Sequence, residues 1–162
     1  MSGNTKKVAI IPTAITAALV LMASTTLMSG TAFAQQGLHF TSGPTATVQG
    51  NTLTVTGEVA GAGRTATATL TGTAEVTQGC VNKGGNEPRG LQTTTEDILV
   101  TEPFNTRQGR GSFTLDFTAT VDPNFSCPSP NMQATVVDVS FTNLELTVTS
   151  QTGTIVTQLP DQ

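Results

Sequence analysis

The chain has 162 residues, of which only 4% are aromatic and 11% are charged, and its formal net charge is −4. If an N-terminal segment that contains Lys6 and Lys7 is removed, the remaining chain has five basic and eleven acidic residues, and its formal net charge is −6. This balance argues against nucleic acids and anionic membrane surfaces as partners, because both are bound by clustered Lys and Arg side chains.

The first 34 residues have the three parts of a secretory signal peptide. Lys6 and Lys7 supply positive charge, residues 8–28 are apolar, and Ala32-Phe33-Ala34 is a small-x-small cleavage site. We expect a signal-peptide helix at residues 1–34, Sec-type export, and one mature domain at residues 35–162 with no membrane attachment. An uncleaved anchor is the alternative, since an apolar stretch of this length can span a bilayer.

From residue 35 onward, apolar residues alternate with threonine at a period of two, which is typical of strands with one wet face. His39 falls in a first strand of this kind. The adjacent Val136 and Val137 break the alternation and predict a bulge. The inward positions, run by run, are Leu53, Val55 and Val59; Ala66, Ala68, Leu70, Ala74 and Val76; Phe113, Leu115, Phe117, Ala119 and Val121; Val136, Val139 and Phe141; and Leu144, Leu146 and Val148.

Turn-forming residues separate these runs, at residues 49–51, 61–63, 122–124 and 151–153. No stretch after residue 35 has a helical period. Seven to nine short strands with one wet face each predict an all-β fold. We expect two antiparallel sheets packed as a sandwich, immunoglobulin-like or a related Greek key.

The chain contains two cysteines, Cys80 and Cys127. Two cysteines in an exported protein are usually paired, because the destination is oxidising. We therefore expect a disulfide. It would bring together the two stretches that lack alternation, residues 81–91 and 126–131.

A polar, glycine-rich loop follows the first cysteine, with the sequence Cys-Val-Asn-Lys-Gly-Gly-Asn-Glu-Pro-Arg-Gly. It resembles a Cys-x-Asn-x-Gly-Gly-Asn-x-x-x-Gly pattern of small exported microbial β-sandwich proteins. Cys127 and residues 134–148 extend the resemblance, which implies no activity. The candidate ligand residues of this loop are Asn82, Lys83, Asn86 and Arg89, since loops on a rigid scaffold often carry recognition. Alternatively, its glycines and asparagines serve only to form tight turns.

The sequence predicts no catalytic residue, no metal site and no cofactor. His39 is the only histidine, so a two-histidine metal site is not available. His39 falls in the expected first strand and the sequence has no Gly-x-Ser-x-Gly elbow, so we expect no Ser-His-Asp triad. The acidic residues are scattered, with no calcium-binding loop pattern. The chain has no Trp or Tyr on which a sugar ring could stack, and only Phe104 and Phe125 lie near loops.

Three functions remain open, and the fold class cannot choose among them. The first is a non-enzymatic extracellular or envelope-associated module that acts in binding or surface structure, with an unknown cell-surface partner. The second is a self-assembling subunit of a pilus-like or fibrous structure, with residues 35–47 as the exchanged strand. Against that, Leu159-Pro160-Asp161-Gln162 lacks the penultimate aromatic residue of donor-strand pilins. The third is a secreted hydrolase.

Export and disulfide formation can be tested together by intact-mass measurement of the protein in medium, envelope and cytoplasm. We expect exported protein to begin at Gln35 and to be two hydrogens lighter than its reduced form. An envelope-bound species with the mass of the whole chain would show that residues 8–28 form an anchor.

Overall fold

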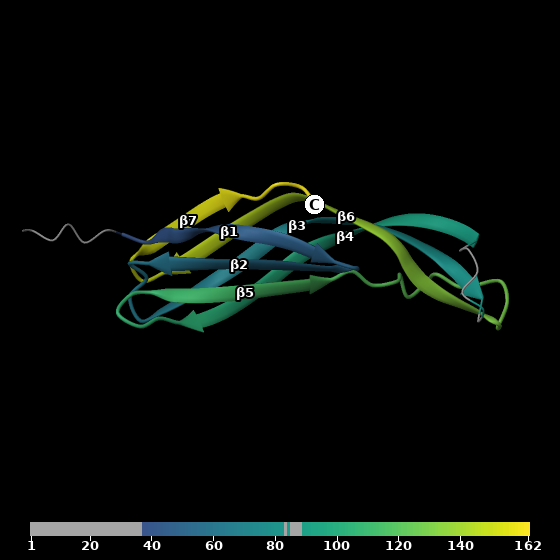
Figure 1. Ribbon diagram of the computed structural model, residues 1–162, viewed down its shortest axis with the longest axis horizontal. Helices are drawn as coiled ribbons and strands as arrows, with labels where there is room; N and C mark the ends of the chain where they lie inside the picture. The colour runs from purple at the N-terminus through teal and green to yellow at the C-terminus, as the bar shows by residue number, and fades with distance from the viewer. Residues whose placement is uncertain (1–36, 83, 85–88) are drawn as a thin grey trace, which may run out of the picture. The chain divides into compact units, whose positions relative to one another are not determined.

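The computed structural model describes residues 37–82, 84 and 89–162, and the predicted signal peptide lies outside this part of the chain. The described residues form two antiparallel sheets, with strand orders β1-β2-β5 and β4-β3-β6-β7, and contain no helix (Figure 1). The prediction of an all-β, two-sheet fold is therefore confirmed. The strands are β1 (His39–Gln49), β2 (Thr52–Ala60), β3 (Thr65–Asn82), β4 (Arg89–Asn105), β5 (Gly111–Thr118), β6 (Met132–Ser150) and β7 (Gly153–Gln158).

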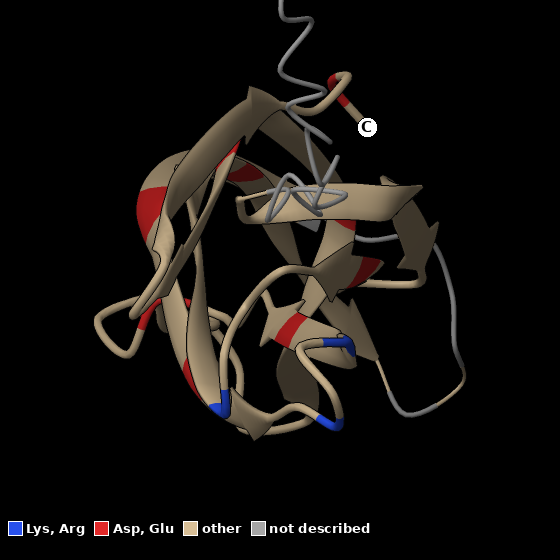
Figure 2. Cartoon of the chain, turned by 90° about the vertical axis from the view of Figure 1, so that its left-hand side faces the viewer, with Lys and Arg blue, Asp and Glu red and all other residues tan. Residues whose placement is uncertain are grey.

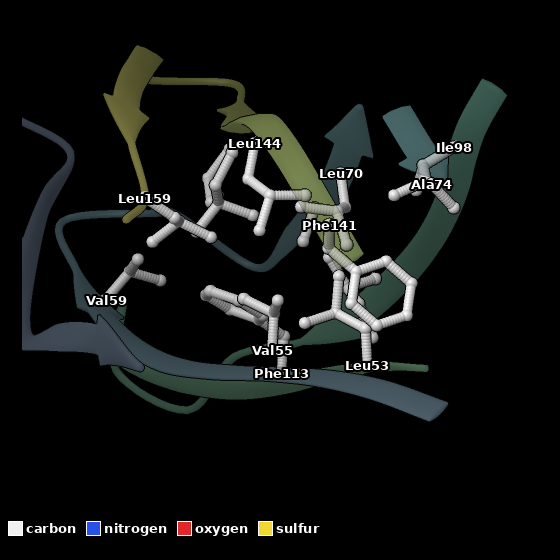
Figure 3. Packing of buried hydrophobic residues seen from close by; sticks show 14 of the residues in the cluster. Leu53, Val55, Val59, Leu70, Ala74, Ile98, Phe113, Phe141, Leu144 and Leu159 are labelled. Atoms are coloured by element: carbon white, nitrogen blue, oxygen red, sulfur yellow. The ribbon is translucent and has the colours of Figure 1, made fainter. Parts of the chain in front are cut away.

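The core lies between the inner faces of the two sheets (Figure 3). Leu53 and Val55 of β2 face the four-stranded sheet, where Leu70 and Phe141 are fully buried. The rings of Phe117 and Phe141 meet edge to face across the core, with centroids 6.2 Å apart. In β2, β3 and β5 apolar residues occupy every second position, so these strands bury one face and leave their threonines on the other.

Cross-strand pairs of threonine hydroxyls line the outer faces of both sheets. The Oγ1 atoms of Thr69 in β3 and Thr101 in β4 are 3.2 Å apart. Those of Thr52 in β2 and Thr118 in β5 are 2.9 Å apart. Such pairs stabilise a sheet by about 0.2–1 kcal/mol each. The threonine-rich alternation therefore contributes to pairing as well as to solubility.

Two sequence expectations need correction, and one strand was not predicted. Residues 92–105, for which the sequence analysis predicted no strand, lie in β4, an edge strand that buries few side chains. The expected loop at residues 81–91 is shorter, since Val81 and Asn82 end β3 and β4 begins at Arg89. The alternating run that was expected to reach Val121 is shorter, because β5 ends at Thr118.

The two expected runs at residues 136–141 and 144–148 are one strand, β6, which continues through an irregularity at Asn143. Asn143 has a φ of 54°, and the pairing with β3 shifts between Thr71 and Thr73. The predicted bulge at Val136 and Val137 is confirmed, because Gln78 pairs with Val136 and Thr77 with Asp138, which leaves Val137 unpaired.

The strands β3, β4 and β6 are 17 to 19 residues long and extend beyond the three-stranded sheet, on the right in Figure 1. We call their extended parts, residues 77–82, 89–93 and 132–138, the distal sheet. Its three strands pair as β4-β3-β6. The connection from β5 to β6, residues 119–131, covers its inner face, and this arrangement positions the site described below.

Substitution of Gly72 by Ala should lower the free energy of unfolding by about 1–3 kcal/mol, the usual cost of overpacking. A Cβ atom at this position would lie 2.7 Å from Cδ2 of Leu144 and 3.1 Å from the carbonyl oxygen of Thr142. Gly43→Ala is the matched control, since a Cβ there meets nothing within 4 Å. Equal urea midpoints for the two variants would show that Leu144 does not pack over Gly72.

Candidate functional site

The distal sheet is fastened to the β5–β6 connection by the disulfide between Cys80 and Cys127, whose Cα atoms are 5.7 Å apart. Cys80 lies in β3, between Ala134 of β6 and Arg89 of β4, and only 3% of it is exposed. The predicted pairing is therefore present in the structure. A disulfide agrees with an oxidising compartment.

A buried glutamine provides a second attachment, which the sequence analysis missed. Gln78 is fully buried, and its Oε1 accepts a hydrogen bond from the backbone N–H of Asp122, 2.8 Å away. Its Nε2 has no hydrogen-bond partner among the described residues. The signal was present in the sequence, because Gln78 continues the inward positions of Ala74 and Val76 towards Cys80 at a period of two.

The structure places two of the four candidate ligand residues of the glycine-rich loop. Asn82 is exposed at the end of β3, and its Oδ1 accepts the backbone N–H of Gly84 at 3.0 Å. Arg89 is the first residue of β4. Lys83 and Asn86 lie outside the described residues, so the hypothesis of a shared ligand loop stays a prediction.

A groove of about 520 Å³ lies beside the distal sheet. Residues 50–51 of the β1–β2 turn and residues 119–121 after β5 line one part of it, and residues 134–139 of β6 line the other. Successive side chains of a strand point to opposite faces of the sheet, so a groove on one face would be lined by every second residue. Because six consecutive residues of β6 line this groove, it follows the edge of the strand. We call it the edge groove.

The edge of β6 is open at this groove because its partner on that side is short. Strand β7 pairs with β6 only from Glu145 to Ser150. The C-terminal tail then continues along the same edge, where the N–H and C=O of Gln162 bond with the C=O and N–H of Phe141, both at 2.9 Å. Among the described residues, no further segment pairs with this side of β6 between residues 132 and 140.

Seven of the eleven residues that line the edge groove are Gly, Ala or Val. The bulge turns Val137 outward, so that 41% of it is exposed. Phe141 directs both main-chain groups towards the tail, and Val139, two residues earlier, directs its N–H to the same side. An unpaired strand edge of this kind binds an extended peptide through main-chain hydrogen bonds, and adjacent pockets select its side chains.

Other residues singled out by the sequence lie apart from this groove. His39 begins β1, with Nδ1 2.8 Å from the carbonyl oxygen of Gly37. The expected exchanged strand, residues 35–47, falls largely in β1, where it pairs with β2 of its own sheet. In the described part of the chain, no three His, Cys, Asp or Glu side chains are grouped to hold a metal ion. That part also has no helix of the length and apolarity needed to cross a bilayer.

Reduction of the disulfide should lower the free energy of unfolding by about 4 kcal/mol, from the chain entropy of a loop of this length. The two cysteines are 47 residues apart in sequence. Guanidinium unfolding of the oxidised protein and of the C80A/C127A variant measures the difference. Unchanged midpoints would contradict this estimate and mean that the bridge contributes no net stability.

No family model matches the chain, and no curated protein sequence matches it significantly. Among solved structures, the chain is similar to the Escherichia coli curli protein CsgC, with 14% sequence identity over 76% of this chain and 97% of that one. The TM-score is 0.24, and we therefore draw no conclusion on fold or function from this likeness.

Proposed function

We propose that residues 35–162 form a non-enzymatic module of the extracellular space or cell envelope that binds an extended segment of a partner protein. The segment adds to the sheet as a strand along the edge of β6, in the edge groove. The observation that carries this proposal is the bonding of Gln162 to Phe141, because the protein's own tail already occupies the same edge as an extended chain.

The composition of the edge groove supports binding rather than hydrolysis. Of its lining residues only Asp138 carries a charge. Glycoside cleavage needs two facing carboxylates, and acyl transfer needs a nucleophile with a base. Main-chain groups and valines, in contrast, match the needs of strand addition.

We also propose that the sandwich is of the immunoglobulin-like, Greek-key kind. The consecutive strands β1 and β2 share one sheet with β5, whereas β3 and β4 share the other sheet with β6 and β7. This division of hairpins between two antiparallel sheets supports that class, in which end loops and edges are the usual recognition surfaces.

A second candidate function is a subunit of a fibrous surface assembly. The observation that favours it is the outer edge of β4, a 17-residue strand that pairs only with β3 among the described residues. Leu99 of this strand is 72% exposed. Pairing of β4 of one copy with β6 of the next would be heterologous, and such contacts build an open filament when the rotation between copies does not close a ring.

Val137→Lys tests the edge of β6, since a charge on an open edge blocks strand pairing. The probe is a set of decapeptides selected from a displayed library on the mature wild-type protein. We expect V137K to weaken their binding about tenfold or more, a loss of about 1.4 kcal/mol. Bound peptide should also slow hydrogen exchange at the amide of Val139.

Val156→Lys is the matched control, since Val156 is a 56% exposed valine of β7 outside the edge groove. Equal weakening by V137K and V156K, or no protection of Val139, would contradict the proposal. Sedimentation velocity distinguishes the second candidate function from the first. If the wild-type protein forms polymers, and both V137K and Leu99→Lys abolish them, the partner is a second copy of the chain.

A further inference from the structure

Three arginines gather at the end of the sandwich that lies opposite the disulfide. Arg64 directly precedes β3, whereas Cys80 lies near the other end of the same strand. Arg107 and Arg110 belong to the connection from β4 to β5. Figure 2 views this end, and the blue segments mark basic residues on its loops.

Hydrogen bonds between the loops hold these arginines near one another. The backbone N–H of Arg107 and that of Arg110 each donate to the other residue's carbonyl oxygen, at 2.7 and 2.9 Å. Gln108 and Gly109 between them have φ values of 52° and 76°, which is the geometry of a tight hairpin turn. The carbonyl oxygen of Arg64 accepts the N–H of Thr106 at 3.0 Å, which joins the two loops.

The three guanidinium groups are exposed and have no carboxylate within ion-pair distance among the described residues. The acidic residues lie mainly in the strands (Figure 2). The mature chain of charge −6 therefore carries three of its five basic residues at one end. A guanidinium group is well suited to bind a carboxylate or sulfate group through paired hydrogen bonds.

A shallow, hydroxyl-rich track starts at this end. Arg110, Thr41, Glu58 and Ser112 line a hollow of about 220 Å³. A second hollow of about 250 Å³ shares Glu58 and Ser112 with the first and continues along the outer face of the three-stranded sheet. The hollows form where β1 departs from regular pairing with β2, on either side of Ser42.

We propose that this arginine end and its track bind an acidic polysaccharide. Arg110 would take a carboxylate or sulfate group of the sugar, and Glu58 would accept a hydrogen bond from a sugar hydroxyl. Thr41 and Ser112 offer further hydroxyl groups in the same hollow. A neutral sugar would leave the arginines unused, and the chain has no Trp or Tyr for stacking.

A single polymer chain fits this surface better than a lipid bilayer does. Peripheral membrane binding usually combines basic residues with apolar side chains that enter the bilayer interface. The large hydrophobic residues that the described part of the chain exposes are not at this end: they are Val48, Leu91, Leu99, Val137 and Val156. A strand-like polymer contacts only the loops and the track.

The test is titration of polygalacturonate into the mature protein, with neutral dextran and phosphatidylglycerol vesicles as comparisons. We expect binding of polygalacturonate alone, weakened by salt. The R107A/R110A variant should bind about tenfold or more weakly, because it loses the charge-assisted contact of Arg110 and the neighbouring positive charge of Arg107. Its melting temperature should match that of the wild type, since both side chains are exposed.

The K83A/R89A variant is the matched control, because it removes the same number of basic charges from the glycine-rich loop sequence that follows Cys80. Retained binding in K83A/R89A with loss in R107A/R110A supports the arginine end. Equal losses of binding in both variants would show that binding depends only on net charge. Loss of binding in K83A/R89A alone would indicate a site in the glycine-rich loop. Binding of vesicles but not polygalacturonate would also overturn the proposal. Peptide binding at the edge groove is independent of every one of these outcomes.

Discussion

The central strand β3 is the element on which the rest of the structure depends. It pairs with β4 on one side and with β6 on the other over nearly its whole length. Its inward residues pass from Ala66 and Leu70 in the core to Gln78 and Cys80 under the β5–β6 connection. One strand therefore organises two different environments: a dry sandwich, and a distal sheet held by a hydrogen bond and a disulfide.

The outline of this fold could be predicted from the sequence because burial and alternation are directly related. Where a strand faces the core, as in β2, the pattern Leu53, Val55, Val59 identifies its buried face. The same argument fails for β4, since an edge strand buries too little to impose alternation, and its Leu99 points to solvent. The continuity of β6 was also missed, because the left-handed conformation of Asn143 lets one strand change phase without a turn.

The candidate sites were less predictable, since they depend on what is near in space rather than in sequence. An open edge can be recognised only when the lengths of neighbouring strands are known. Because β7 is short, the edge of β6 that faces away from β3 has no partner between residues 132 and 140 among the described residues. The arginine end joins residues from positions 64 and 107–110, which no local pattern connects. The bulge at Val137, in contrast, was readable, because two adjacent valines break a period of two.

The disulfide has a consequence for biogenesis. A chain with two cysteines allows only one intramolecular bridge, so oxidation cannot give a wrong pairing within the molecule. In an oxidising compartment a thiol oxidant is then sufficient, and a disulfide isomerase has no intramolecular error to correct. The competing product is a dimer linked between two chains. We therefore expect the yield of correctly oxidised protein to depend on its concentration during oxidation rather than on reshuffling of bonds.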